Sequence, residues 1–296
     1  MGGIFVRQSS LGGKIFDTAN YLFLAVVALM MILPVMYIVA GSFASEIEIG
    51  SRSFFLIPKS FTLNAYQYVF KDNALPRSLL VSVFVTVAGT IVNLFFTFTM
   101  AYGLSRRNMI GRNIMMNLIV FSMVFSGGMI PTYLIVKSMG LLNSYWAVML
   151  PTAINAFNLI VVKSFFQEIP NELIESARID GCNDLGVLWR IVLPLSKPVI
   201  ATFALFYAVL HWNDFFNALL YLSDSKMWPM QVLLRQMILL ASGALDMSTM
   251  DLTYVKPPDQ SIKMAVVVVG TLPILLVYPF IQKHFAKGVL LGAVKG

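Results

Sequence analysis

The chain alternates between long runs of apolar residues and shorter polar segments. About 20 helical residues are needed to cross a hydrocarbon core about 30 Å thick, so uncharged runs of that length are predicted membrane spans. We therefore expect an all-α membrane protein with six transmembrane helices, forming a single transmembrane domain over residues 1–296. The six predicted spans cover approximately residues 18–42, 78–104, 113–136, 145–162, 199–222 and 264–281.

Prolines interrupt most of these runs. A proline lacks the N–H of the helical ladder, and a bilayer tolerates this only where neighbouring helices or internal water satisfy the freed carbonyls. The segment 126–131, which reads Ser-Gly-Gly-Met-Ile-Pro, is the predicted position of a helix break. We favour a passive kink there over a gating hinge. The prolines within the runs are Pro34, Pro131, Pro151, Pro273 and Pro279.

Composition supports a membrane protein. Of the 296 residues, 58% are hydrophobic and 12% are charged, compared with about 45–50% and about 25% in soluble domains. The single cysteine, Cys182, excludes an intrachain disulfide and a multi-cysteine metal site. The net charge of +7 comes from Lys and Arg residues dispersed between apolar runs. It therefore does not predict a nucleic-acid partner, which would call for a basic stripe.

The basic residues in short flanking segments predict the orientation, because such segments are enriched in Lys and Arg on the cytoplasmic side. Basic residues lie in the tails 1–17 and 282–296 and in the segment 105–112, whereas the short loop 138–144 has none. Both termini are therefore predicted to be cytoplasmic. The loop 163–198 is then cytoplasmic, and the loops 43–77 and 223–263 are external. The basic residues that set this orientation are Arg7, Lys14, Arg106, Arg107, Arg112, Lys283, Lys287 and Lys295.

The cytoplasmic loop 163–198 contains two predicted short helices. The first begins at Pro170 and Asn171 and is closed by Gly181, which can adopt the left-handed conformation. Leu173, Ile174 and Ala177 share an apolar face of this helix. The second helix begins at Asp184 and is predicted to stop before Pro194. Their exposed apolar faces fit a groove on a partner protein and the lipid surface equally well.

The same loop carries a motif. Glu175-Ser176-Ala177, then Gly181, Ile191 and Leu193-Pro194 occur in the order and spacing of the EAA loop. The chain thereby resembles permeases of binding-protein-dependent ABC importers, in the carbohydrate-uptake branch that takes maltose-type sugars and oligosaccharides. The resemblance covers residues 77–284, which we take as the core of the domain. Ser176 stands where the motif has Ala, a small-for-small exchange.

The resemblance implies that this loop forms a coupling helix seated in a cleft of an ATPase subunit. Glu175 would contact the ATPase and Ala177 would lie against its surface. The coupling would drive alternating access of the permease. The residues assigned to ATPase coupling are Glu172, Glu175, Ser176, Ala177, Asp180, Gly181, Ile191, Leu193 and Pro194.

ATP hydrolysis is expected on another polypeptide. The chain has no phosphate loop of the form Gly-x4-Gly-Lys-Ser/Thr: Gly181 and Gly186 have the right spacing, but Val187 replaces the Lys. We therefore predict that the chain is not an enzyme and binds no cofactor, with ATP and Mg on an ATPase dimer. The resemblance implies three further partners, namely a homologous second permease subunit, an extracytoplasmic solute-binding protein and the sugar. The expected location is a bacterial cytoplasmic (inner) membrane, among its lipids.

The fifth predicted span is unusually polar. Tyr207, His211 and Asp214 fall on one helical face, with Asn213 and Asn217 beside them. A carboxylate at the centre of a bilayer costs about 2.5–3.5 kcal/mol, so Asp214 should face protein or water. These residues form either a translocation path or an interhelical hydrogen-bond clamp, and we favour the clamp.

The external loop 223–263 is too long for a simple connector. Its Trp228-Pro229-Met230 segment looks like a docking site for the binding protein, as in maltose-type importers, and the loop 44–76 would share this role. Packing on the membrane surface is the alternative for both. The sugar is expected to be an oligosaccharide, with acidic ones such as alginate or pectin fragments included. The alternative function is that of a secondary, ion-coupled transporter, for which Asp214 alone is weak support.

Overall fold

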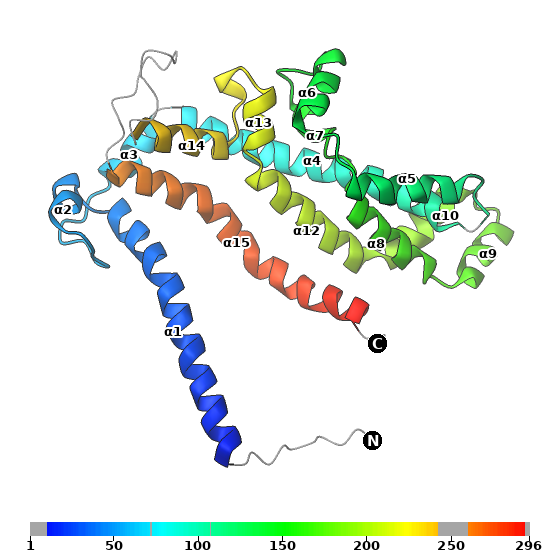
Figure 1. Ribbon diagram of the computed structural model, residues 1–296, viewed down its shortest axis with the longest axis horizontal. Coiled ribbons are helices and arrows are strands. Elements are labelled where there is room, and N and C mark those ends of the chain that lie inside the picture. The colour runs from blue at the N-terminus through cyan, green and yellow to red at the C-terminus, as the bar shows by residue number, and fades with distance from the viewer. Residues whose placement is uncertain (1–10, 72, 107, 242–259, 294–296) are drawn as a thin grey trace. The chain divides into compact units, whose positions relative to one another are not determined.

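The structure is a computed structural model that describes residues 11–71, 73–106, 108–241 and 260–293 (Figure 1). The described residues are predominantly α-helical and contain no β-strand; their isolated β-bridge joins Ala44 and Phe61. The prediction of an all-α protein is therefore confirmed at the level of the class.

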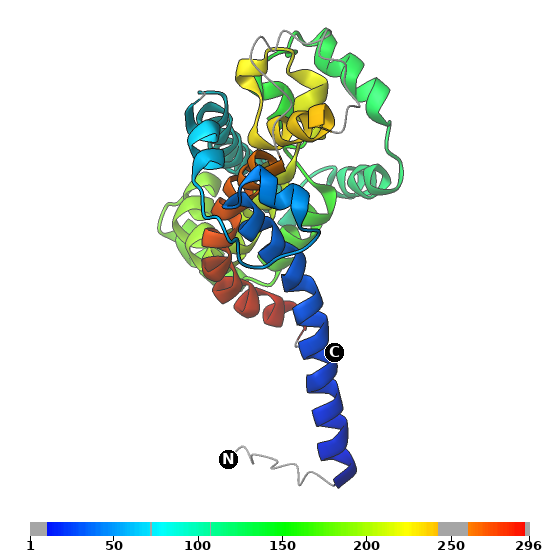
Figure 2. The same cartoon turned by 90° about the vertical axis from the view of Figure 1, so that its left-hand side faces the viewer.

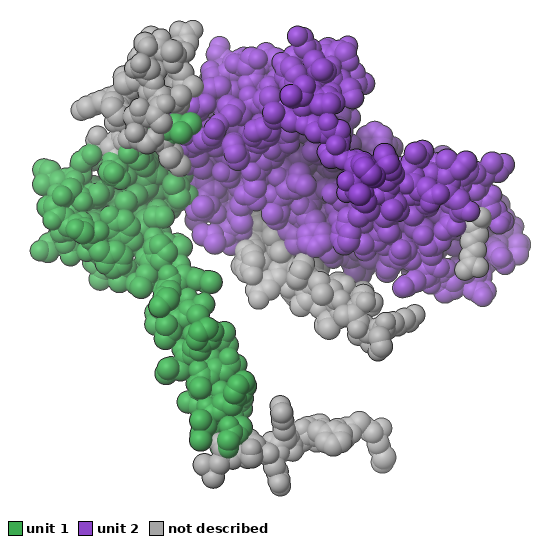
Figure 3. All heavy atoms as spheres, in the orientation of Figure 1, with its two compact units in different colours: residues 1–71, 237–269 green, residues 72–236, 270–296 purple. Residues whose placement is uncertain are grey.

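The chain divides into two compact units (Figure 3). Unit 1 comprises residues 1–71 and 237–269, and unit 2 comprises residues 72–236 and 270–296. Helices α14 (Met230–Ala241) and α15 (Gln260–Ala293) contribute residues to both units. The sequence indicated a single domain, and its boundaries remain predictions.

Unit 1 contains the first predicted span as helix α1 (Leu11–Ser42). The helix projects from the rest of its unit, and its most apolar stretch is unburied (Figures 1 and 2). Pro34 lies inside α1 without ending it. At the C-terminal end, Gly41 lies directly against the side chain of Met264 of α15, so a larger residue there would require this flexible side chain to move.

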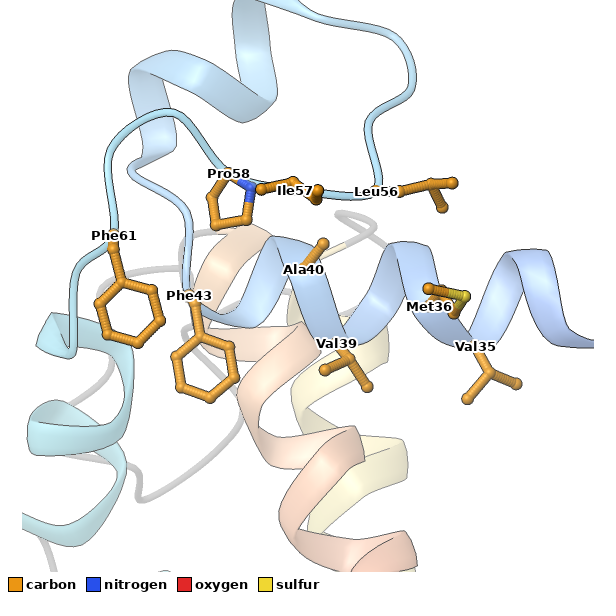
Figure 4. A pocket seen from close by; sticks show the side chains of 9 residues that line it. All are labelled: Val35, Met36, Val39, Ala40, Phe43, Leu56, Ile57, Pro58 and Phe61. Carbon is orange, nitrogen blue, oxygen red and sulfur yellow. The ribbon is translucent and has the colours of Figure 1, made fainter.

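A structured loop follows α1, with two short helices, α2 (Glu46–Ser51) and α3 (Asn64–Lys71). Glu48 organises it: its carboxylate accepts hydrogen bonds from the backbone N–H groups of Lys59 and Ser60, and from Arg52 at 2.7 Å. These bonds, led by that from Lys59, lower the pKa of Glu48 to about 2. The loop and the last turns of α1 border an apolar groove of about 450 Å³, lined by residues that include Val39, Phe43, Ile57 and Phe61 (Figure 4).

Unit 2 is built around helix α4, which packs against α8 and α12. Their buried side chains form one apolar cluster that includes Phe98 of α4, Leu159 of α8 and Phe203 of α12. The other helices of unit 2 before α14 lie in the segments that connect α4, α8 and α12 or follow α12. The helices are α4 (Ala74–Ser105), α5 (Arg112–Val124), α6 (Met129–Ser138), α7 (Tyr145–Met149), α8 (Ala156–Gln167), α9 (Asn171–Ile179), α10 (Asp184–Val187), α11 (Leu193–Leu195), α12 (Lys197–Asn213) and α13 (Phe216–Tyr221).

Three of the predicted spans are broken helices. The third breaks between α5 and α6, where Gly128 has a φ of 84°, as the Ser-Gly-Gly-Met-Ile-Pro segment predicted. The fourth breaks between α7 and α8, next to Pro151, which the sequence predicted to interrupt the helical hydrogen bonds. The fifth breaks at Asp214, which has an extended backbone with a ψ of 99°.

Two described helices are long and apolar enough to cross a bilayer alone, over Gly12–Ser42 and Ala74–Ser105. A third candidate is a pair, Asp184–Leu195 and Lys197–Asn213, bent by 84° at its break. The shorter apolar helices in the described parts include Arg112–Val124 and Ala156–Gln167, which adjoin the breaks in the third and fourth predicted spans. The count of six spans therefore stays a prediction.

Candidate functional site

The helix expected from the motif is α9 (Asn171–Ile179). Pro170 precedes its first residue, and Glu172 lies in the first turn, near the positive end of the helix dipole. Gly181 has a φ of 84°, and the Cys182 N–H donates to the Ala177 carbonyl at 2.9 Å. A left-handed glycine followed by this bond is how many helices end. The predicted start and stop are confirmed as secondary structure.

The sequence predicted that the second helix of the loop stops before Pro194. In the structure the helix continues past this residue. Helix α10, capped by the Asn183 side chain at 2.7 Å from the Gly186 nitrogen, continues into a π-helical turn over Leu188–Val192 and then into α11. Pro194 cannot donate the next helical bond, and its ring would clash with the carbonyl four residues earlier. The wider π turn just before it removes that conflict and lets the helix run on.

The apolar faces of these helices point into the protein. Ile174 and Ala177 are each 5% exposed and pack in the cluster of α4, α8 and α12, together with Val187 and Leu188. The expectation that Ala177 lies on the surface of a partner is therefore wrong for this conformation, because the loop has its own core. The large apolar side chains that face outward are Leu173, Ile179, Leu185, Trp189 and Leu195.

The other residues assigned to coupling divide by exposure. On and after α9, Glu172, Glu175, Ser176, Asp180 and Gly181 are exposed, as is Pro194, whereas Ile191 and Leu193 are half-buried against the core cluster. Arg178 and Asp184 form an ion pair at 2.7 Å that joins α9 to α10. The Asp184 carboxylate raises the pKa of the Arg178 guanidinium through this hydrogen bond. Both side chains are more than half exposed, so the pair orients the helices more than it stabilises them.

The polar residues of the fifth predicted span contact α4. The Tyr207 and Thr97 hydroxyls lie 2.8 Å apart, and His211 Nε2 lies 2.6 Å from Asn93 Oδ1. Both Tyr207 and His211 are buried, which fits the clamp interpretation. The sequence-based reading missed Asn93, Thr97 and the facing Gly89. Gly89, Asn93 and Thr97 follow one another at intervals of four residues in the second predicted span. This spacing places them on one face of a helix and could have indicated the contact.

Asp214 does not share a helical face with Tyr207 and His211, because α12 ends at Asn213. The Asp214 carboxylate instead accepts hydrogen bonds from the Asn217 N–H at 3.1 Å and from its side-chain amide at 2.8 Å. Asp214 thus caps the start of α13. Asn213 is exposed, and its side chain donates to the Val209 carbonyl at 2.9 Å.

The Trp228-Pro229-Met230 segment packs within unit 2. Trp228 Nε1 donates to the Leu222 carbonyl at 3.0 Å, the Met230 N–H donates to Ser82 Oγ at 2.7 Å, and Pro229 and Met230 are buried. The expectation that this segment is a docking surface is wrong for Pro229 and Met230 in this conformation. Residues 242–259 of the same loop lie outside the described residues.

A family model described as "Binding-protein-dependent transport system inner membrane component" matches residues 93–291. The chain belongs to this family. The matched residues include α9, its left-handed Gly181 and the helices on which α9 packs. The protein is therefore a membrane component of a transport system, not an enzyme, and is hereafter called the permease.

Relatives of the permease match along nearly all of its length. Protein LplC of Bacillus subtilis is 60% identical over 100% of both chains. The polygalacturonan/rhamnogalacturonan transport system permease protein YtcP of the same species is 61% identical, covering 96% of this chain and 99% of YtcP. A similar fold occurs in a crystal structure of a bacterial ABC transporter involved in the import of the acidic polysaccharide alginate. One of its chains is 32% identical to the permease with a TM-score of 0.85, and the match covers 93% of the permease and 98% of that chain.

Proposed function

We propose that the permease is one half of the membrane core of an ATP-driven importer. It crosses the inner membrane six times, with both termini cytoplasmic, and pairs with a homologous second permease subunit. An ATPase dimer with ATP and Mg binds the cytoplasmic loop 163–198, and an extracytoplasmic binding protein delivers the substrate. The family match supports this assembly, and the orientation rests on the distribution of Lys and Arg.

The seating of α9 is the observation that carries the coupling role. Ile174 and Ala177 of α9 pack into the same buried cluster as Phe98 of α4, Phe166 of α8 and Phe203 of α12. Close-packed interiors deform little, so a displacement of α9 is passed to these helices. On the opposite side, α9 offers Glu172, Ser176, Ile179 and Asp180 to the cytosol. This exposed side of α9 would lie in the cleft of the ATPase.

The mechanism that follows is mechanical. The ATPase subunits close when they bind ATP, the two seated helices move with them, and the permease halves change from inward-open to outward-open. ATP acts as a ligand that binds one conformation better and so shifts a two-state equilibrium. Hydrolysis then restores the inward-open state.

The substrate class is proposed to be oligosaccharides that contain uronic acids. Support comes from the name of YtcP, which refers to polygalacturonan and rhamnogalacturonan, and from the alginate importer that matches the fold. Calorimetry on the cognate binding protein tests this proposal. An oligogalacturonide should bind, whereas binding of a neutral arabino-oligosaccharide alone would contradict the assignment.

Transport in reconstituted vesicles tests the energy source. The complete complex, with ATP on the ATPase side and no ion gradient, should accumulate sugar. A permease pair that accumulates sugar from an ion gradient without the ATPase would instead be a secondary transporter. That result would refute the proposed function.

A further inference from the structure

A polar hollow of about 290 Å³ lies beside α9. One wall is the face of α9 that carries Asn171, Glu175 and Arg178. The opposite wall is the end of α4 and the residues after it, with Arg106 and Asn108. The hollow is therefore continuous with the surface of α9 that the proposed function assigns to the ATPase.

Arg106 is the cation in this hollow without an ion pair among the described residues. Its guanidinium stacks over the Tyr102 ring, with 4.3 Å from Cζ to the ring centroid, which fixes the plane of the fork. Its Nε is buried and has no hydrogen-bond partner in the described parts of the chain. Arg178, in contrast, already holds Asp184 at 2.7 Å. Because Nε is shielded, the other N–H groups of the Arg106 guanidinium, which lines the hollow, are the donors for an incoming acceptor.

The chemistry of the hollow selects a planar anion. An oriented guanidinium binds a carboxylate through two parallel hydrogen bonds. The amide side chains of Asn108, Gln167 and Asn171 also line the hollow and supply further donors. Glu175 lines it too, but no ion pair joins Glu175 to Arg106.

We propose that this hollow receives an acidic side chain of the ATPase subunit, which forms paired hydrogen bonds with Arg106. The proposal rests on the proposed function, because it places the ATPase against α9. It adds a second contact, of opposite charge to the acidic side chains that α9 presents. The ATPase would then contact both the exposed side of α9 and the hollow beside this helix. Two contacts would fix the rotation of α9 about its axis as well as its position.

The test measures the affinity of the purified ATPase for the permease pair in lipid nanodiscs. Arg106→Ala should weaken binding roughly tenfold to a hundredfold, as expected for loss of a charged hydrogen-bonded contact. Arg106→Lys should recover only part of the loss, since an ammonium lacks the planar fork. The control is Arg190→Ala, an exposed cation of the loop 163–198 that lies outside the hollow, which should change affinity by less than about threefold. Equal affinities for Arg106→Ala and Arg190→Ala would overturn the proposal.

Two other sources of the anion are distinguished by the same measurement. Repeating it in phosphatidylcholine alone and with added phosphatidylglycerol tests a lipid phosphate, and an effect of Arg106→Ala that needs the anionic lipid overturns the proposal. Repeating it in a Glu175→Gln background tests an internal partner. The loss should persist there, and its disappearance would assign the anion to Glu175.

A labelling experiment keeps Arg106 intact, in case its substitution prevents folding. In a Cys182→Ser background, a cysteine introduced by Asn108→Cys should react with a maleimide in the permease pair and be protected when the ATPase is added. Reaction that continues unchanged overturns the proposal. In a separate preparation, also with Cys182→Ser, Ile179→Cys should cross-link to the ATPase. A cross-link without protection at position 108 rejects the hollow alone, whereas absence of the cross-link rejects the coupling role itself.

Discussion

The contact between Gly89 of α4 and His211 of α12 gives a sharp prediction about packing. A Cβ placed on Gly89 would lie 2.5 Å from His211 Nε2 and 2.7 Å from Cδ2 and Cε1. The imidazole ring has little freedom to retreat, because its Nε2 is hydrogen-bonded to Asn93 at 2.6 Å. Gly89→Ala should therefore force apart two helices of the core.

The size of the effect follows from two losses. Overpacking a close-packed site costs about 1–3 kcal/mol. An interhelical hydrogen bond inside a membrane contributes about 0.6 kcal/mol. Gly89→Ala should thus destabilise the permease by on the order of 2 kcal/mol. By the relation for soluble domains of 150–250 residues, this lowers the melting temperature by about 4–8 °C.

Thermal unfolding of the purified permease pair in detergent provides the assay. The matched control is Gly103→Ala in the same helix, where the nearest atom to the added Cβ is the Met109 sulfur at 3.9 Å. It should be neutral or stabilising by up to about 1 kcal/mol, because alanine favours the helix. Adding Gly89→Ala to His211→Ala should cost nothing further. If Gly89→Ala and Gly103→Ala have the same melting temperature, the described packing of α4 on α12 is wrong.

Three further predictions concern single side chains. Tyr207→Phe removes the 2.8 Å bond to Thr97 and should cost about 0.6–1.7 kcal/mol in the same thermal assay, so an unchanged melting temperature would contradict the clamp. The pKa of Glu48, about 2 against an ordinary 4.5, means that its stabilisation of the loop 43–77 is complete above pH 4.5 and lost as the pH falls toward about 2. Exchange protection of amides 59 and 60, corrected for intrinsic rates, should decline across that range, and Glu48→Gln should abolish this dependence. Gly181→Val should cost about 1–2 kcal/mol at the left-handed turn after α9 and reduce ATPase copurification, and Gly181→Asn should reduce it less.

The sequence predicted those parts of the fold that depend on local patterns. The uncharged run 78–104 became α4 because no proline interrupts it after the first turn. The Ser-Gly-Gly-Met-Ile-Pro segment predicted the break before α6, and Gly181 predicted the end of α9. In each case, the backbone preference of a few adjacent residues is sufficient to decide the structure.

Features that depend on contacts between distant residues were not predicted. Ile174 and Ala177 looked like a surface for a partner, because the sequence does not reveal that α4, α8 and α12 cover them. Asp214 was placed within a helix, whereas its bonds to Asn217 favour a break and a cap for α13. The π turn before Pro194 depends on how the chain relieves a steric conflict, which residue pattern alone does not specify.

Cross-linking from α9 tests whether the ATPase acts on the permease through this helix. Ile179 is 86% exposed on α9, and Ile57 is 79% exposed on the loop predicted to be external. In a Cys182→Ser background, Ile179→Cys should give an adduct with the ATPase and block ATP-driven uptake, whereas Ile57→Cys should give none. Absence of the Ile179 adduct in every nucleotide state, with uptake still driven by ATP, would show that α9 does not couple the ATPase to the permease.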